Sequence, residues 1–413
     1  MKAIIITIGD ELLIGQVINT NAAFISERLN SVGIQIGRVL TVGDAQAEIL
    51  ASFRENFDRY DVIVVTGGLG PTHDDITKKA VCAFFQTDLV PSDEAREKIR
   101  TFLKLRDRPW SDAAEEQTLV PRGSIVIPNN HGTASGILFE RPGKYFICMP
   151  GVPYEMEGMI NEFILPYFSG KSTGDVVLHR TLKTSGIAES TLSNRLGNID
   201  EIIGNGTLAF LPSPSGVRMR ISVVNANRAA GERLLREIES RIRAKVGETI
   251  YGSDDEELEE VAGRLLAERG LKLALAESCT GGMIAHHMTN VPGSSAYFER
   301  AVVVYSNQSK IDSIGVPGEL IERHGAVSRE VAEAMAEGIR TVAGTDIGIS
   351  TTGIAGPSGG TPRKPVGLVW IGYSDRSRTF SRKYQFGGHR TRVKEQATRA
   401  ALELLRRTLL GID

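Results

Sequence analysis

The chain has 413 residues, three cysteines and a formal net charge of −2. This length exceeds one typical core, so we expect two or three domains. The balanced charge gives no general attraction to nucleic acid or to an anionic membrane, and no apolar run approaches the length of a membrane span. Cys82, Cys148 and Cys279 lack metal-ligand spacing, which favours a reduced, cytoplasmic protein.

Strand-like and helix-like segments alternate in the first part of the chain. Apolar and β-branched runs predict strands over 2–8, 34–42 and 61–65, and amphipathic spacing predicts helices over 22–29, 45–57 and 75–85. This alternation is typical of a doubly wound parallel α/β sheet. A helix over 93–105, a loop over 106–114 and short strands over 125–127, 136–140 and 145–149 follow.

A glycine-rich loop, Thr66-Gly67-Gly68-Leu69-Gly70-Pro71-Thr72, follows the third strand. Glycines between a strand and a helix let backbone N–H groups approach a phosphate. The loop is neither a Walker A motif nor a GxGxxG fingerprint. Asp74 and Asp75 follow and suggest a divalent cation, although they equally suit the positive end of a helix. His73 is a weaker candidate ligand, because a lone histidine is more often structural.

The region from 171 to about 250 has a different character. A strand-like run over 176–184 precedes a short helix opened by 185–190, and a second run over 217–224 precedes a charged helix over 231–246. We expect a small α+β unit that packs against the first domain. A capping box at 253–256 is predicted to open a helix reaching about residue 267 and to mark the start of the last domain.

The last region is organised around residues 274–283, where an apolar run ends in Ser278, Cys279, Thr280 and two glycines before a helical pattern resumes. This pattern predicts a strand, a tight turn and a helix. A serine there lies beside the N–H groups of a helix N-terminus, which stabilise a developing oxyanion. The alternative is that Ser278 or Thr280 only caps the helix.

Two more strands, 302–305 and 347–353, end in polar side chains: the first leads into Tyr305 and Lys310, and the second contains Thr352. If all three strands are parallel, their carboxyl ends meet at one edge and form one crevice. A desolvated lysine can activate a serine, as in Ser-Lys pairs.

Cys279 is a rival nucleophile, because thiols attack more readily than hydroxyls. A cysteine amidase would normally use a nearby histidine. His286 and His287 lie about two turns along the following helix and are expected to point away, so Ser278 is preferred.

The last part of the chain predicts two strands, 366–374 and 379–386, and then a basic segment, 387–394, that opens the final helix. An Arg can bind a phosphate through two parallel hydrogen bonds, so Arg390 is the preferred phosphate ligand and Arg392 the second choice. Surface solubility would explain the same charges.

The motifs AESCTGG, YSNxxK, SxTGIAGPxGG and KPVGxVW, within about residues 255–410, resemble the C-terminal domain of the competence/damage-inducible CinA family. That domain is similar to nicotinamide mononucleotide (NMN) deamidases. The resemblance implies a cofactor-free amidase with Ser278 as nucleophile, Lys310 as base, and Tyr305 and Thr352 assisting. It implies NMN contacts from Glu277, Cys279, Thr280, Gly281, Gly282, Gly353, Gly356, Arg390 and Arg392. The family commonly carries Asp where this chain has His389.

Near the N-terminus, GDELLxGxxxNTN, TGGLGPTxDDxT and MPGVPxEM resemble the N-terminal domain of the same family, which is similar to the molybdopterin-binding fold. The resemblance implies hydrolysis of the ADP-ribose pyrophosphate with a divalent metal ion such as Mg²⁺. Implied ADP-ribose contacts are Gly9, Glu11, Asn19, Asn21, Thr66, Gly67, Gly68, Gly70, Pro71, Thr72 and Lys183. The carboxylates in matching motifs include Asp10, and the implied metal ligands are Asp44, Asp74, Asp75 and Glu155.

We therefore expect three domains: 1–170, 171–252 and 253–413. The middle one resembles a KH module, but Gly204-Asn205-Gly206 is not a GxxG loop, so RNA binding is not expected. The expected partners are small nucleotides and, from the family resemblance, a second copy of the chain, with no membrane and no nucleic acid. The alternatives are a non-catalytic competence or DNA-damage accessory protein and a pterin-binding N-terminal domain.

Overall fold

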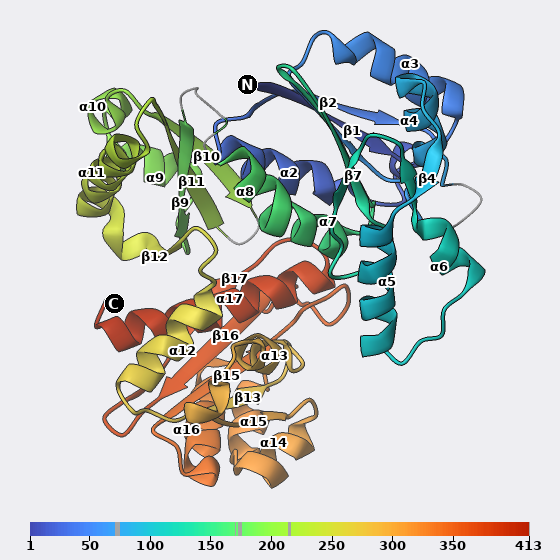
Figure 1. The fold of residues 1–413 in the computed structure, drawn as a ribbon. Helices are drawn as coiled ribbons and strands as arrows, with labels where there is room; N and C mark the ends of the chain where they lie inside the picture. The colour runs from blue at the N-terminus through green and yellow to red at the C-terminus, as the bar shows by residue number, and fades with distance from the viewer. Residues whose placement is uncertain (71–74, 170, 172–175, 214–215, 413) are drawn as a thin grey trace. The chain divides into compact units, whose positions relative to one another are not determined.

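The computed structural model describes residues 1–70, 75–169, 171, 176–213 and 216–412. The chain divides into two compact units (Figure 1). The first contains residues 1–178 and 223–234, and the second contains 179–222 and 235–413. Most of the middle region therefore belongs to the unit that holds the C-terminal domain, which differs from our expectation. No described helix is both long and apolar enough to cross a bilayer.

A six-stranded sheet, in the order β2-β1-β3-β8-β7-β6, is the centre of the first unit. The strands β2, β1, β3 and β8 pair in parallel, and β7 and β6 add antiparallel pairs at one edge. Ile5 packs into one core cluster, and Ile4 and Ile6 pack into another. Because both faces of the sheet are covered, β1 is a continuous apolar run rather than an alternating one. The predicted doubly wound α/β fold is confirmed.

The elements predicted for this domain are present, with ends that differ by at most two residues. Their bounds are β1 (Lys2–Ile8), α1 (Asp10–Leu13), α2 (Thr20–Asn30), β2 (Gln35–Val42), α3 (Gln46–Phe57), β3 (Val62–Thr66), α4 (Thr77–Phe85), β4 (Leu89–Pro91), α5 (Asp93–Leu105), α6 (Asp112–Gln117), β5 (Leu119–Pro121), β6 (Ile125–Ile127), β7 (Gly136–Arg141), β8 (Lys144–Met149), α7 (Pro153–Met159), a π-helical turn (Ile160–Ile164) and α8 (Leu165–Phe168).

The expected loop over 106–114 is wrong at its end, where α6 begins. Ser111 caps this helix, because its Oγ accepts a hydrogen bond from the N–H of Ala114 at 3.2 Å. The small sheet of β4 and β5 was also not expected. Both strands are only three residues long, too short for a periodic signal.

The middle region forms a four-stranded sheet in the order β10-β11-β9-β12. The predicted strands β9 and β11 are present, whereas β10 was missed because it has no clear alternation. The bounds are β9 (Val176–Thr184), α9 (Glu189–Leu196), α10 (Ile199–Ile203), β10 (Thr207–Ser213), β11 (Gly216–Asn225), α11 (Arg228–Val246), a 3₁₀ turn (Gly247–Thr249) and β12 (Ile250–Ser253).

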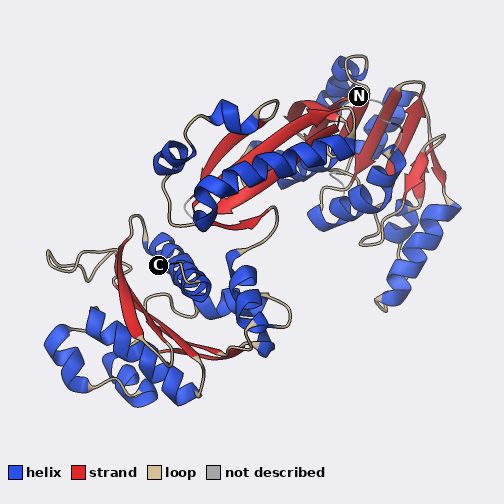
Figure 2. Ribbon diagram, turned by 90° about the vertical axis from the view of Figure 1, so that its left-hand side faces the viewer, coloured by secondary structure: helices blue, strands red, loops and turns tan. Residues whose placement is uncertain are grey.

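The C-terminal domain contains a five-stranded sheet, β14-β13-β15-β16-β17, with helices on both faces (Figure 2). The strand β13 pairs in parallel with β14 and β15, as predicted, and β16 and β17 add an antiparallel hairpin. The bounds are α12 (Leu258–Glu268), β13 (Leu273–Glu277), α13 (Met283–Asn290), a 3₁₀ turn (Ser294–Ala296), β14 (Phe298–Val303), α14 (Asn307–Ile314), α15 (Gly318–His324), α16 (Arg329–Ala343), β15 (Ile347–Gly353), β16 (Leu368–Ser374), β17 (Thr379–Gln385) and α17 (Arg390–Leu410).

The predicted capping box at Ser253 is wrong. Helix α12 begins after Glu257, whose side chain forms a capping box with Glu260. Ser253 does donate to the Glu256 carboxylate through its N–H and its hydroxyl. Asp254, however, has a φ of 51°, so the backbone turns there instead of entering a helix.

Candidate active site

The predicted serine turn lies at the carboxyl edge of the C-terminal sheet. Along β13, Ala274 and Ala276 face the cluster formed with α14 and α16, and Leu273 and Leu275 face the cluster formed with α12, α13 and α17. Because side chains alternate along a strand, Ser278 continues the first face and Glu277 the second. Ser278 therefore points to the side where α14 carries Lys310.

Ser278 and Lys310 are in contact. The Lys310 Nζ lies 3.3 Å from the Ser278 Oγ, and it also donates to the backbone carbonyl of Val304 at 2.8 Å. Lys310 is 1% exposed and Ser278 is 9% exposed. Burial lowers the pKa of Lys310 below its usual value, because desolvation disfavours the charged amine. The pair therefore consists of a nearly buried hydroxyl in contact with an amine that loses its proton more readily than usual.

Glu277 holds the turn that carries Ser278. Its carboxylate is fully buried and accepts hydrogen bonds from the N–H groups of Gly282, Ile284 and Ala285 at 2.9, 3.2 and 2.8 Å. These donors belong to the start of α13, so Glu277 satisfies the helix N-terminus. In the structure, the Glu277 side chain is buried and binds the start of α13. The family resemblance had implied a contact with the nucleotide.

The helix N-terminus is therefore not the oxyanion pocket that we expected. The N–H of Ser278 donates to the carbonyl of Thr351 at 3.0 Å. The Cys279 amide interacts with its own thiol, whereas the amides of Thr280 and Gly281 donate to no backbone carbonyl in the described part of the chain. Gly281 and Gly282 have φ values of 63° and 92°, which only glycine adopts at little cost. The turn amides are the remaining candidates for binding an oxyanion.

The alternative interpretation, that Ser278 or Thr280 only caps α13, is wrong. The N-cap of α13 is Gly282, and no side chain of Ser278 or Thr280 caps the helix. The Thr280 hydroxyl instead contacts the Thr351 hydroxyl at 2.8 Å. Thr352 is buried and its hydroxyl donates to the carbonyl of Ala326 at 2.7 Å. Thr352 thus links β15 to the loop before α16 on the face that holds Lys310.

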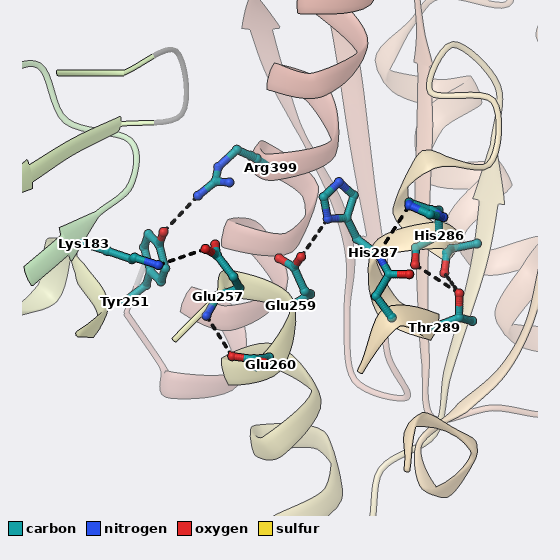
Figure 3. A network of polar contacts seen from close by, with 11 residues as sticks. Lys183, Tyr251, Glu257, Glu259, Glu260, His286, His287, Thr289 and Arg399 are labelled. Carbon is teal, nitrogen blue, oxygen red and sulfur yellow. Dashed lines mark hydrogen bonds and ion pairs between the residues drawn. The ribbon is translucent and has the colours of Figure 1, made fainter. Parts of the chain in front are cut away.

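The rival nucleophile is in an unfavourable environment. Cys279 is 6% exposed, and burial raises the pKa of its thiol to about 12. His287 contacts Glu259 at 2.8 Å and His286 contacts Asn290 at 3.3 Å (Figure 3). As expected, neither histidine approaches the thiol.

Tyr305 and Arg390 form a second group at the rim of the site. The Arg390 guanidinium donates to the Tyr305 hydroxyl at 2.7 Å and to the carbonyl of Gly356 at 2.9 Å. Tyr305 is 61% exposed. The structure therefore joins the tyrosine to the basic start of α17 and to the glycine-rich loop after Gly353.

His389 caps α17 at the position where the resemblance led us to expect an aspartate. Its Nδ1 accepts from the N–H of Arg392 at 3.5 Å, the outer limit of a hydrogen bond. The cap position is kept, but the bond is longer than a carboxylate would form. The Arg392 side chain is exposed at this end of the helix.

In the N-terminal domain, the carboxyl ends of β1, β3 and β8 bring several predicted residues together. Gly67 and Gly68 have φ values of 112° and 66°, and a side chain on Gly67 would collide with the carbonyl of Ile8. Asn21 donates to the carbonyl of Gly151 at 2.7 Å, and its buried Oδ1 has no hydrogen-bond partner among the described residues. Most buried acceptors in proteins have a partner, so this side chain is an exception at the edge of the sheet.

Other predicted ADP-ribose contacts have structural partners. The Asn19 side chain caps α2 and the Thr66 hydroxyl donates to the carbonyl of Pro150. Gly9 adopts a φ of 155° beside Glu11, and Gly70 lies against the carboxylate of Asp75. Pro71, Thr72, His73 and Asp74 lie outside the described residues.

The carboxylates that the structure describes do not by themselves fit a metal ion. Asp10 and Asp44 each accept a hydrogen bond from the other's backbone N–H. Glu155 is nearly buried, accepts from Asn129 at 2.7 Å, and has a pKa raised by burial. Among the described residues, no three His, Cys, Asp or Glu side chains form a metal-binding group, and this includes Asp75.

Lys183, the predicted phosphate contact of the middle region, pairs with Glu257 at 2.9 Å (Figure 3). Tyr251 accepts from Arg399 of α17 at 2.9 Å in the same group of contacts. A phosphate contact from Lys183 requires its ion pair with Glu257 to open, so that role stays a prediction.

Comparison with known proteins covers the whole chain. Residues 255–409 match the model of the CinA C-terminal domain, residues 4–170 match a probable molybdopterin binding domain, and residues 179–252 match the damage-inducible protein CinA KH domain. A CinA-like protein of Chloroherpeton thalassium is 44% identical over 99% of both chains, and one of Salinibacter ruber is 43% identical over 99% of this chain and 100% of its own.

The chain belongs to the CinA family. Its three-part architecture is that of the family models. Among solved structures, the competence/damage inducible protein CihA from Agrobacterium tumefaciens is 37% identical, covers 38% of this chain and 97% of its own, and has a TM-score of 0.36.

Lys394 belongs to the predicted basic segment 387–394, but the sequence did not lead us to assign it to the site of the CinA C-terminal domain. A Cβ built on Gly281 would lie 3.4 Å from the Lys394 Nζ, so this lysine adjoins the turn that carries Ser278. Lys394 follows Arg390 by four residues on α17, which places both side chains on one face of the helix. The four-residue spacing from Arg390 could have identified Lys394 as a site residue from the sequence.

Proposed function

We propose that the C-terminal domain is an amidase that converts NMN to nicotinic acid mononucleotide and ammonia. The observation that carries this proposal is the contact of 3.3 Å between the buried Lys310 amine and the Ser278 hydroxyl. The lowered pKa of Lys310 supports it, because a base must lose its own proton before it can accept one.

In the first half of the reaction, the neutral Lys310 amine accepts the proton of the Ser278 hydroxyl as the Oγ attacks the carboxamide carbon. The amide oxygen becomes an oxyanion that the turn amides of 279–281 stabilise. Lys310 then returns the proton to the amide nitrogen. The C–N bond breaks, ammonia leaves, and an ester joins the acyl group to Ser278.

In the second half, Lys310 accepts a proton from water, and the resulting hydroxide attacks the ester carbon. The C–O bond to Ser278 breaks, Lys310 returns the proton to the Oγ, and nicotinic acid mononucleotide is released. Lys310 performs every proton transfer, so this route calls for no cofactor.

The substrate phosphate is assigned to the basic start of α17. Arg390 already donates to Tyr305 and Gly356 at the rim of the site, so its guanidinium is held in one place. Arginine binds phosphate through two parallel hydrogen bonds, which suits this position. Arg392 and Lys394 add positive charge nearby.

The identity of the nucleophile is tested by two neighbouring alanine variants. We expect Ser278→Ala to lower kcat for ammonia release from NMN by more than about a thousandfold, because the attacking oxygen is lost. We expect Cys279→Ala to stay within about tenfold, since its thiol is buried and protonated. The reverse pattern would assign the reaction to Cys279, and wild-type protein that releases no ammonia would favour the accessory-protein alternative.

The role of Lys310 predicts a specific pH dependence. The charged amine cannot accept a proton, so kcat/KM should rise as pH rises through the Lys310 pKa, which burial places below the usual value of about 10.4. Lys310→Arg should lose roughly a hundredfold or more at every pH, because a guanidinium stays charged. Lys383→Arg, on an exposed position of β17, is the control. An unchanged profile in Lys310→Arg would exclude the lysine as base.

The phosphate assignment is tested with two substrates. We expect Arg390→Ala to raise KM for NMN by about tenfold or more while leaving kinetics with nicotinamide riboside, which has no phosphate, unchanged. Arg392→Ala is the matched comparison on the same helix turn. A larger effect in Arg392→Ala would move the phosphate to that residue, and an equal effect on both substrates would remove the assignment.

We also propose that the N-terminal domain binds ADP-ribose and hydrolyses its pyrophosphate to AMP and ribose 5-phosphate. The unpartnered Oδ1 of Asn21 and the left-handed backbone of Gly67 and Gly68 support binding at this sheet edge. A divalent cation is part of the proposal, but the described carboxylates form no site for it, and we assign it no step.

Titration calorimetry with ADP-ribose, first in chelator and then with Mg²⁺, tests this second activity. We expect binding, and an affinity about tenfold lower in Asn21→Ala because that side chain loses its ligand contact. Asn30→Ala, at the end of the same helix, is the control. The absence of binding in both conditions would contradict the proposal, and binding of a pterin instead would favour the pterin-binding alternative.

A further inference from the structure

A cavity in the N-terminal domain lies between α5 and α6, two helices that are neighbours in Figure 1. Its volume is about 800 Å³, within the range of small-molecule sites, which is about 300 to 1,000 Å³. None of its lining residues belongs to the glycine loops described above. The residues that matter to its chemistry are Arg96, Arg100, Lys104, Arg108, Trp110 and Glu115.

The sequence of α5 explains one wall of this cavity. Ala95, Ile99 and Leu103 are spaced by four residues and are buried toward the domain. Arg96, Arg100 and Lys104 have the same spacing one position further along, so their side chains share the neighbouring face of the helix. A row of cations therefore stands directly beside the row that anchors the helix.

The opposite wall carries an aromatic ring that is held in place. The Trp110 Nε1 donates to the Glu115 carboxylate at 3.1 Å, and the same carboxylate accepts from Arg96 at 2.5 Å. Trp110 is nevertheless 39% exposed. One carboxylate thus orients both the ring and the first guanidinium, while part of the ring remains open to a ligand.

The charge of the lining is positive although the chain as a whole is slightly acidic. Four cationic side chains face two carboxylates, those of Asp107 and Glu115, and Glu115 is already engaged by Arg96 and Trp110. Among the described residues, Arg100 forms one ion pair, with Glu97 at 3.6 Å, and this is a weak surface pair. The cations can therefore accept an anionic group without breaking a strong ion pair.

We propose that this cavity binds a free nucleotide, with AMP as the test ligand. The base stacks on Trp110, because aromatic side chains stack on any base. The phosphate is bound by Arg100 and Lys104, since guanidinium and ammonium groups form charge-assisted hydrogen bonds with phosphate oxygens. A solvated helix face would account for the cations alone. It does not account for an exposed indole that the Glu115 carboxylate holds beside them.

Tryptophan fluorescence tests the proposal directly. The chain has two tryptophans, so Trp370→Phe leaves Trp110 as the reporter. We expect AMP to quench this signal saturably, and adenosine or inorganic phosphate alone to bind at least about tenfold more weakly. Replacing both Arg100 and Lys104 by alanine should weaken AMP binding by about tenfold or more. Arg54→Ala, on the exposed face of α3, should change it by less than about twofold.

Three results would overturn the assignment. The first is the absence of saturable quenching by AMP. The second is an equal weakening in Arg54→Ala, which would show that only overall charge matters. The third is tighter binding of a short single-stranded oligonucleotide than of AMP, which would make a nucleic acid strand the ligand in place of a free nucleotide. Circular dichroism of each variant verifies that α5 and α6 remain folded.

Discussion

The serine turn depends on one buried carboxylate. Glu277 accepts three backbone hydrogen bonds from the start of α13, so the end of β13 and the beginning of the next helix are held by a single side chain. A buried carboxylate is costly unless its oxygens are satisfied, and charge-assisted hydrogen bonds in a protein interior are strong. The chain between Glu277 and Gly282 must therefore close as a tight turn. That turn sets Ser278 on the opposite face of the sheet, where Lys310 is found.

The burial of Lys310 is the second constraint on the site, and burying its charged form lowers the stability of the fold. A buried ammonium is unfavourable, and the carbonyl of Val304 at 2.8 Å offsets part of that cost. The remaining penalty appears as a lowered pKa, and a lowered pKa is what a base acting on a serine hydroxyl requires. The same burial has the opposite consequence for Cys279, because it keeps the thiol protonated. One dry environment therefore favours the Ser-Lys pair and disfavours the neighbouring cysteine.

The two ligand sites that we propose in the N-terminal domain differ in kind. At the sheet edge, glycine backbone and the buried, unpartnered Oδ1 of Asn21 place polar groups at the ends of parallel strands, among the residues that the structure describes. Between α5 and α6, long cationic side chains and the indole of Trp110 line a cavity. The first surface relies on the close approach of backbone, and the second on side chains that one carboxylate orients. The two sites share no residues, so their binding can be measured separately.

Local pattern in the sequence determined the strands and most helices, and the alternation of strand and helix determined that β13, β14 and β15 run parallel. Parallel strands end at one edge, so the meeting of Ser278 and Lys310 followed from the sequence. Only the tertiary structure decided that Glu277 caps α13, that Tyr305 contacts Arg390, and that α12 begins after Glu257. The physical reason is that a side chain forms hydrogen bonds with the groups that are adjacent to it in the folded protein. Some of those groups are distant in sequence: Tyr305 and Arg390 are separated by 85 positions. In other cases two nearby residues could each form the same kind of capping hydrogen bond, as Ser253 and Glu257 could here.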